Sequence, residues 1–261
     1  MFEITSYDIT SKKIPKSFHG YKIAHLSDLH GALHGAGNEE LIRAIDQTPP
    51  DLIVMTGDMM DHRGGAVKTA LDLCRKLAKR YPVYYAIGNH EQTLAKPVWQ
   101  DAVHELCDMD VRILDNQKLE LTVDGWSIDV YGLTTPMVYY KDPLGEYERG
   151  VELTKGHVTD LLGVSDKARF KLLLAHNPLY FPAYYNWGAD LTLSGHVHGG
   201  IIRIPGLGGL LSPDMTFFPK YDAGHFKRNG RHLIVSRGLG NNFLFRICNK
   251  PELIFITLTS T

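Results

Sequence analysis

Five short polar clusters contain the residue types that could carry out chemistry, and each of them follows an apolar run. They read Ser27-Asp28-Leu29-His30, Gly57-Asp58-Met59-Met60-Asp61, Gly88-Asn89-His90-Glu91, Ala175-His176-Asn177-Pro178 and Ser194-Gly195-His196-Val197-His198. Residues two apart on an extended chain point to the same side, so Asp28/His30 and His196/His198 can each offer two ligands together. Carboxylates, imidazoles and one carboxamide, without sulfur, form a donor set that suits Mn, Fe or Zn, and Mg more weakly.

The number of candidate ligands predicts two metal ions. Seven side chains exceed the four that a tetrahedral zinc accepts, and they suit two metals that share one carboxylate. Two divalent ions supply about +4 and two aspartates return about −2, which leaves the site positive. That charge favours a phosphoryl group as the substrate.

Six apolar runs predict the strands that position these clusters. They are Tyr21–Ser27, Asp51–Thr56, Val83–Ile87, Lys171–Ala175, Asp190–Ser194 and His232–Ser236. Helical patterns cover Asn38–Gln47, with Asn38 as the expected N-cap, and Ala66–Arg80. Strands that alternate with helices indicate an α/β sheet, and ligands of such sheets bind outside the carboxyl ends of the strands. We therefore expect the clusters to converge at that edge.

Two other stretches refine this picture. The alternation over Lys118–Leu133 around Asp124-Gly125 predicts a hairpin, so the sheet is mixed or there is a second sheet. Ile201–Phe226 is rich in Gly and Pro and is expected to form a long structured loop, a functional candidate by its length. Trp126 and Trp187 are expected in the core.

The composition is that of an ordinary folded chain, and no linker divides it, so we expect one domain over residues 1–261. The 28 Lys+Arg and 29 Asp+Glu give a formal charge of −1, which makes a nucleic-acid partner unexpected. The longest apolar run, Val83–Ile87, is too short for a membrane span. The first residues lack the layout of a secretion signal, so we expect a cytoplasmic location. Three scattered cysteines do not make a disulfide framework.

The ordered series Asp-x-His, Gly-Asp, Gly-Asn-His-Glu, His and Gly-His-x-His, from Asp28 to His198, resembles the calcineurin-like metallophosphoesterase superfamily. Gly199-Gly200-Ile201, Arg203-Ile204-Pro205-Gly206 and Ser236-Arg237-Gly238-Leu239-Gly240 are similar to a bacterial branch that includes UDP-diacylglucosamine diphosphatase-like phosphodiesterases. This chain has Ile201 where that branch often has Gln. The resemblance implies a four-layer α/β/β/α sandwich with two mixed β-sheets flanked by helices.

The resemblance also implies the role of each candidate residue. One metal would be held by Asp28, His30, Asp58 and His198, and a second by Asp58, Asn89, His176 and His196, so that Asp58 bridges the two. His90 would protonate the leaving group, with Asp61 or Glu91 available to steady it. The implied activity is hydrolysis of a phosphodiester or pyrophosphate bond by in-line attack of a hydroxide that bridges two divalent or trivalent ions.

Other functions and other residues remain open at this level. The fold could serve as a binding scaffold, as the retromer subunit of this fold does without a complete catalytic set, or as a metal-dependent nuclease. We expect a small-molecule phosphate ester as substrate. The apolar residues of 201–218, which include Leu207, Met215, Phe217 and Phe218, would then contact a lipid-linked substrate, the core or a membrane surface.

The histidines outside the predicted ligand set divide into three groups. His25 is expected in the core, and His34 and His62 are candidate phosphate contacts because they lie close to the ligand loops. His225 and His232 are expected at the surface.

Overall fold

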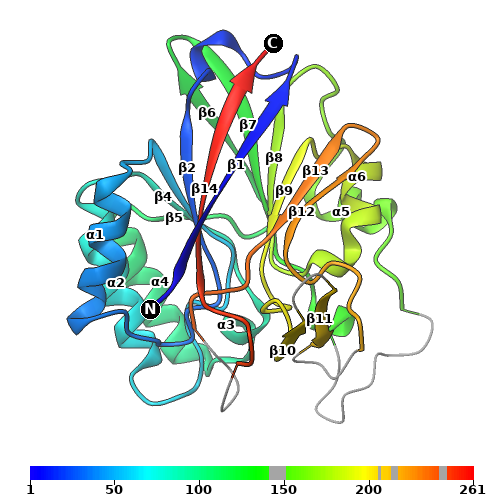
Figure 1. Ribbon diagram of the computed structural model, residues 1–261. Helices are drawn as coiled ribbons and strands as arrows, with labels where there is room; N and C mark the ends of the chain where they lie inside the picture. The colour runs from blue at the N-terminus through cyan, green and yellow to red at the C-terminus, as the bar shows by residue number, and fades with distance from the viewer. Residues whose placement is uncertain (141–150, 205–206, 213–216, 241–245) are drawn as a thin grey trace.

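Two six-stranded sheets form the centre of the structure, a computed structural model that describes residues 1–140, 151–204, 207–212, 217–240 and 246–261 (Figure 1). The first sheet has the order β1-β14-β2-β3-β4-β5. Its strands are β1 (Glu3–Ser11), β14 (Glu252–Ser260), β2 (Lys22–Leu26), β3 (Leu52–Met55), β4 (Val83–Tyr85) and β5 (Arg112–Ile113). Strands β2, β3, β4 and β5 are parallel to one another, and β14 is antiparallel to β2.

The second sheet has the order β12-β13-β9-β8-β7-β6. Its strands are β12 (Gly224–Arg228), β13 (Arg231–Val235), β9 (Leu191–Ser194), β8 (Lys171–Ala175), β7 (Trp126–Leu133) and β6 (Gln117–Val123). The four central strands are parallel to one another, and each edge strand, β12 or β6, is antiparallel to its neighbour. Both sheets are therefore mixed, as expected.

The strands are apolar on both faces because each sheet is covered twice. In β3, Leu52 and Val54 join the core between the two sheets, whereas Ile53 and Met55 face the helices. The same alternation occurs in β8, where Leu172 lies between the sheets. Successive side chains of a strand point to opposite faces of the sheet, so one continuous apolar run contributes to two separate cores.

Helices cover the outer face of each sheet (Figure 1). The first sheet carries α1 (Glu39–Gln47), α2 (Ala66–Ala78) and α4 (Lys96–Asp108), and the second carries α5 (Lys155–Leu162) and α6 (Phe181–Trp187). Shorter helices are α3 (Asn89–Thr93), η1 (Lys16–Phe18), η2 (Ala36–Asn38), η3 (Met137–Tyr139) and η4 (Pro178–Tyr180). This order of layers confirms the predicted α/β/β/α sandwich. Every helix of the described ranges is too short or too polar to cross a bilayer.

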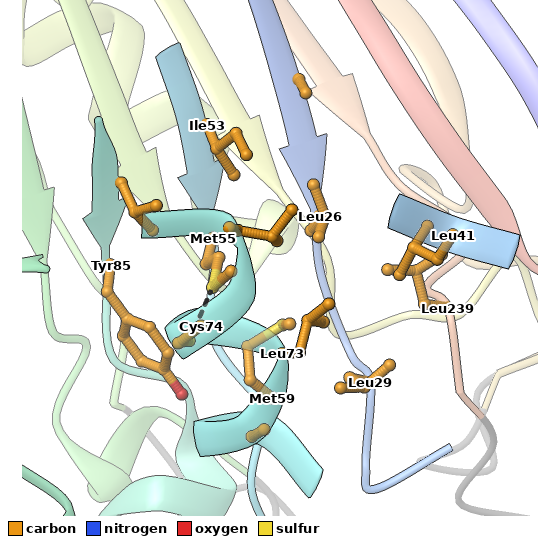
Figure 2. Close-up of a cluster of buried hydrophobic side chains, with 14 of the residues drawn as sticks. Leu26, Leu29, Leu41, Ile53, Met55, Met59, Leu73, Cys74, Tyr85 and Leu239 are labelled. Carbon is orange, nitrogen blue, oxygen red and sulfur yellow. Dashed lines mark hydrogen bonds between the residues drawn. The ribbon is translucent and has the colours of Figure 1, made fainter. Parts of the chain in front are cut away.

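The core under α2 is built from leucine, methionine and cysteine side chains (Figure 2). Cys74 of α2 lies over Met55 of β3, with the two sulfur atoms 3.7 Å apart. Figure 2 shows Leu73 on the same helix among Leu26, Leu29 and Met59. Burial raises the pKa of the Cys74 thiol to about 12, so this cysteine is a structural residue and an unreactive one.

Several local predictions are confirmed and others are wrong. The hairpin between β6 and β7 turns at Asp124 and Gly125, whose φ values of 48° and 77° are those of a type I′ turn. Asn38 precedes α1 but does not cap it, because its Oδ1 accepts from the backbone N–H of His34 at 2.8 Å. Trp187 is buried as expected, but Trp126 is 67% exposed beside the hairpin turn.

The stretch 201–226 is more regular than the predicted loop. It contains the antiparallel pair β10 (Ile202–Ile204) and β11 (Gly208–Leu211) and enters β12. Leu207, Phe217 and Phe218 are exposed, and Met215 lies outside the described residues. His232 contradicts the surface prediction, because it is buried and its Nδ1 lies 2.8 Å from Nε2 of His225.

Candidate metal centre

The five polar clusters meet where parallel strands of both sheets end. They follow β2, β3 and β4 of the first sheet and β8 and β9 of the second. Backbone hydrogen bonds tie neighbouring loops, from Asp28 N–H to Gly57 O at 3.0 Å and from Gly195 N–H to His176 O at 3.0 Å. The Asp28 carboxylate joins the two sheets by accepting from the backbone N–H of His196 at 3.0 Å. The clusters thus converge at the predicted edge.

The backbone at this edge is held in an unusual conformation. Five candidate ligands have left-handed φ values between 47° and 67°: Asp28, His30, Asp58, His196 and His198. This conformation costs an L-residue roughly 1–2 kcal/mol, and such strain gathers at functional sites where surrounding contacts enforce it. The left-handed residues thus occur in the three loops that follow β2, β3 and β9.

Asp28, His30 and His198 form the first group of ligand atoms, all within 4.8 Å of one another. The Nε2 atoms of His30 and His198 lie 3.2 Å apart, and Nε2 of His198 lies 3.3 Å from Oδ1 of Asp28. Two nitrogens that each bind a metal at about 2.0–2.1 Å are separated by about 3.3 Å in a tetrahedral site. The spacing of this group therefore fits a single cation.

Asp58, His176 and His196 form the second group, also within 4.8 Å of one another. Nε2 of His176 lies 3.0 Å from Oδ2 of Asp58. The buried Oδ1 of Asn89 accepts no hydrogen bond from any described residue. A buried oxygen without a donor costs about 1–3 kcal/mol, and a cation would satisfy it. The donors present therefore fit a second metal ion.

The Asp58 carboxylate lies between the two groups. Its Oδ2 is 3.0 Å from Nε2 of His176, 3.8 Å from Nε2 of His30 and 3.9 Å from Nε2 of His90. Burial would raise the pKa of Asp58, but the imidazoles of His176, His90 and His30 hold it well below its usual value. The same carboxylate raises the pKa of His176 to about 10 against the opposing effect of burial. Asp58 is therefore an anion that attracts positive charge on both sides.

Outer contacts orient the rings of three candidate ligands. Nδ1 of His176 donates to Thr56 O at 2.7 Å, and Nδ1 of His30 lies 3.2 Å from Oδ2 of Asp61. These contacts leave the Nε2 atoms facing the site, as in metal centres where a carbonyl or carboxylate holds the far side of a histidine. His198 differs, because its Nδ1 lies 3.0 Å from the Arg246 guanidinium. The sequence gives no local signal for this contact of Arg246.

The Glu91 carboxylate holds the loop that carries Asp58. Oε2 accepts from the backbone N–H groups of Asp58 at 2.8 Å and Gly88 at 3.0 Å. Oε1 accepts from the Met60 N–H at 3.0 Å and the Tyr85 hydroxyl at 2.6 Å. Sequence reasoning offered Glu91 only as a partner of His90 and missed this role.

Asp61, the other residue predicted to steady His90, lies close to that histidine. A carboxylate oxygen of Asp61 lies within 4.8 Å of ring nitrogens of His30 and His90. The same carboxylate contacts His30 and Arg63.

The remaining histidines occupy different positions. His90 lies beside Asp58, and its ring is 4.7 Å from that of His30 between centroids. Exposed His62 stacks near His90 at 6.2 Å between centroids. His34 is buried and its Nε2 lies 2.9 Å from Leu239 O, so its ring is engaged by the backbone. His25 is a buried core residue, as expected, with Nε2 2.8 Å from the Thr56 hydroxyl.

Replacing Gly88 by alanine is expected to displace Asp58. A Cβ at this position would lie 2.2 Å from Oδ1 and 2.5 Å from the backbone nitrogen of Asp58. Overpacking of this kind costs about 1–3 kcal/mol. Gly88→Ala should therefore reduce metal affinity at least tenfold, measured by competition with a metal indicator. Gly64→Ala is the matched control, because a Cβ there meets nothing within 4 Å. Equal affinities in the two variants would contradict the expectation.

Comparison with known proteins agrees with this geometry. The pattern of the family described as calcineurin-like phosphoesterase matches residues 21–200. The metallophosphoesterase YkuE of Bacillus subtilis is 30% identical over 266 residues, which cover 100% of this chain and 87% of that protein. The phosphodiesterase YaeI of Escherichia coli is 25% identical over 246 residues, covering 91% of this chain and 82% of that protein.

Similarity to a solved structure supports the fold. The phosphopantetheinyl hydrolase PptH of Mycobacterium tuberculosis superposes with a TM-score of 0.53 at 15% identity, over 86% of this chain and 91% of that chain. The match to the family pattern includes each of the seven candidate metal ligands, from Asp28 to His198. The chain belongs to the calcineurin-like phosphoesterase family.

Proposed function

We propose that the chain is a dinuclear metal-dependent phosphoesterase that hydrolyses a phosphodiester or pyrophosphate bond. The observation that carries this proposal is the position of Asp58 between two groups of ligand atoms, with Oδ2 3.0 Å from His176 and 3.8 Å from His30. A carboxylate has two oxygens and can face two cations, so one side chain can join both groups into one centre. The phosphodiesterase named among the relatives favours a diester over a monoester.

The residues have separate tasks in this reaction. Asp28 and Asp58 supply buried negative charge, and the imidazoles and Asn89 supply neutral donors, so two divalent ions would leave the site positive toward phosphate. Such ions would lower the pKa of bound water and offset charge on the phosphoryl oxygens. His90 stands beside the centre without belonging to either predicted ligand set. Its ring is 19% exposed, so it can reach the oxygen of a leaving group.

A lipid-linked substrate is the narrower form of the proposal, as in the UDP-diacylglucosamine diphosphatase-like branch. Its support is the group of exposed apolar side chains that follow His198 in the chain: Leu207, Phe217 and Phe218. A contiguous patch of exposed apolar side chains commonly marks a site for a ligand, a protein or a membrane. A soluble small-molecule diester remains the broader expectation.

Metal removal and replacement test the proposed function. The stripped protein is refilled with Mn, Fe, Zn or Mg in turn and assayed on diesters, monoesters, oligonucleotides and nucleoside-diphosphate lipids. We expect about two metals per chain and turnover of diesters or pyrophosphate-linked substrates above monoesters. A metal-loaded protein that hydrolyses no phosphate ester would favour the scaffold function. Cleavage confined to oligonucleotides, with binding that weakens steeply as salt rises, would favour a nuclease.

A further inference from the structure

A groove of about 700 Å³ is lined by residues of α2 and α4. Figure 1 shows these two helices on the outer face of the first sheet. The apolar lining of the groove consists of Val67, Leu71, Leu94, Ala95 and Val98. The Val98 side chain is 41% exposed although it is large and apolar. This volume lies within the range of small-molecule sites.

One end of the groove adjoins the candidate metal centre. Asp61 and His62 line the groove, and Asp61 also belongs to the group of ligand atoms that includes His30 and His90. The ring of His62 is nearly parallel to that of His90, with 11° between the planes and 6.2 Å between the centroids. A molecule seated at this end of the groove would therefore contact Asp61 or His62, the two lining residues that lie next to His90.

The charges around the groove are balanced. Its charged lining residues are three cations, Arg63, Lys68 and Arg75, and three carboxylates, Asp61, Asp72 and Glu105. They pair with one another: Arg63 with Asp61, Lys68 with Asp72, and Arg75 with both Asp72 and Glu105, at 2.8 and 2.7 Å. The groove therefore gives no net attraction to an anion, whereas its apolar lining favours an uncharged, hydrophobic group.

We propose that this groove binds the uncharged, apolar alcohol portion of the substrate, the part that leaves on hydrolysis. The inference rests on the proposed function. Hydrolysis forms a bond from a water oxygen to phosphorus and breaks the bond from phosphorus to the alcohol oxygen, which takes up a proton. The alcohol must then lie on the side of His90, and two residues that line the groove, Asp61 and His62, lie next to His90. We expect the occupant of the groove to be an aryl or alkyl alcohol, because the balanced charges of the lining give a nucleotide no net attraction.

Two diesters with leaving groups of similar acidity test this assignment: methyl phenyl phosphate and methyl 4-butylphenyl phosphate. Burial of one methylene contributes about 0.8 kcal/mol, or about fourfold, so partial burial of the butyl chain should raise kcat/KM about tenfold or more. Val98→Glu and Ala95→Trp are expected to bring the ratio of the two kcat/KM values close to one. Both positions are exposed, so we expect both variants to fold, which circular dichroism would check. The two substitutions then test the groove independently.

Val164→Glu is the matched control. Val164 is 88% exposed and follows α5, which covers the other sheet, so this variant should keep the wild-type ratio. The groove assignment would be overturned if the ratio of the two kcat/KM values is near one in the wild-type chain, or if it is raised and both groove variants keep it raised. Neither outcome would contradict diester hydrolysis itself.

Binding of 4-butylphenol, measured by calorimetry, separates the groove from the proposed function. If the wild-type chain binds 4-butylphenol and Val98→Glu weakens this binding at least fivefold, the groove assignment is supported even if the metal-loaded protein hydrolyses no ester. Absence of hydrolysis would then count against the proposed function alone. Binding that is absent, or that Val98→Glu does not change, overturns the groove as a site for the alcohol.

Discussion

The Asp58→Asn variant is expected to lose hydrolysis of every phosphate ester that the wild-type chain cleaves and to bind less metal at both positions. Asp58 is the one carboxylate predicted to serve both ions, and its Oδ2 faces the histidines of both groups. Asparagine keeps one oxygen but removes the charge. Since metal-ion catalysis contributes several kcal/mol, turnover should fall by about 10³-fold or more.

Asparagine is chosen so that the substitution does not disturb the backbone conformation at position 58. Asp58 has a φ of 53°, and asparagine tolerates this left-handed conformation better than most residues. Elemental analysis and turnover are measured together, with Asp46→Asn as the control, because Asp46 lies on α1 and pairs with Arg80 at the surface. Two metals per chain with near-normal turnover in Asp58→Asn would refute the bridging role.

Replacing His90 by alanine is expected to affect substrates according to how much their leaving group needs a proton. An alkoxide leaves poorly, and general acid catalysis contributes about 10²–10⁴-fold, so hydrolysis of dialkyl diesters should fall in that range. A nitrophenolate leaves without such help, so hydrolysis of nitrophenyl diesters should fall far less. Both metals should be retained, because His90 belongs to neither predicted ligand set.

The measurement compares kcat/KM for alkyl and nitrophenyl diesters in wild-type and variant protein. His104→Ala is the control, since His104 is an exposed residue of α4. Equal losses on the two substrate types would make His90 a group that positions or stabilises charge. Loss of a metal would make it a ligand, and the assignment to the leaving group would be wrong.

Much of the fold and the convergence of the site could be predicted from local sequence. Runs such as Leu52–Met55 are apolar on both faces and imply a doubly covered sheet, and Asp124-Gly125 has the residue types of a tight turn. The five clusters follow strands that prove parallel to their neighbours, so their meeting at one edge is a consequence of topology. These signals are short-range: residues a few positions apart encode them through side-chain periodicity and turn conformation.

The remaining features depend on contacts between residues far apart in the chain. Glu91 binds the backbone of Asp58, 33 positions away, and Arg246 reaches His198 across 48 positions. Asn38 has the residue type of an N-cap, yet its oxygen accepts from the His34 backbone instead. Trp126 is exposed although its side chain is large and apolar. These hydrogen-bond partners and exposures depend on which loops the two packed sheets bring together. The local propensity of a residue contributes too little free energy to select one partner over another.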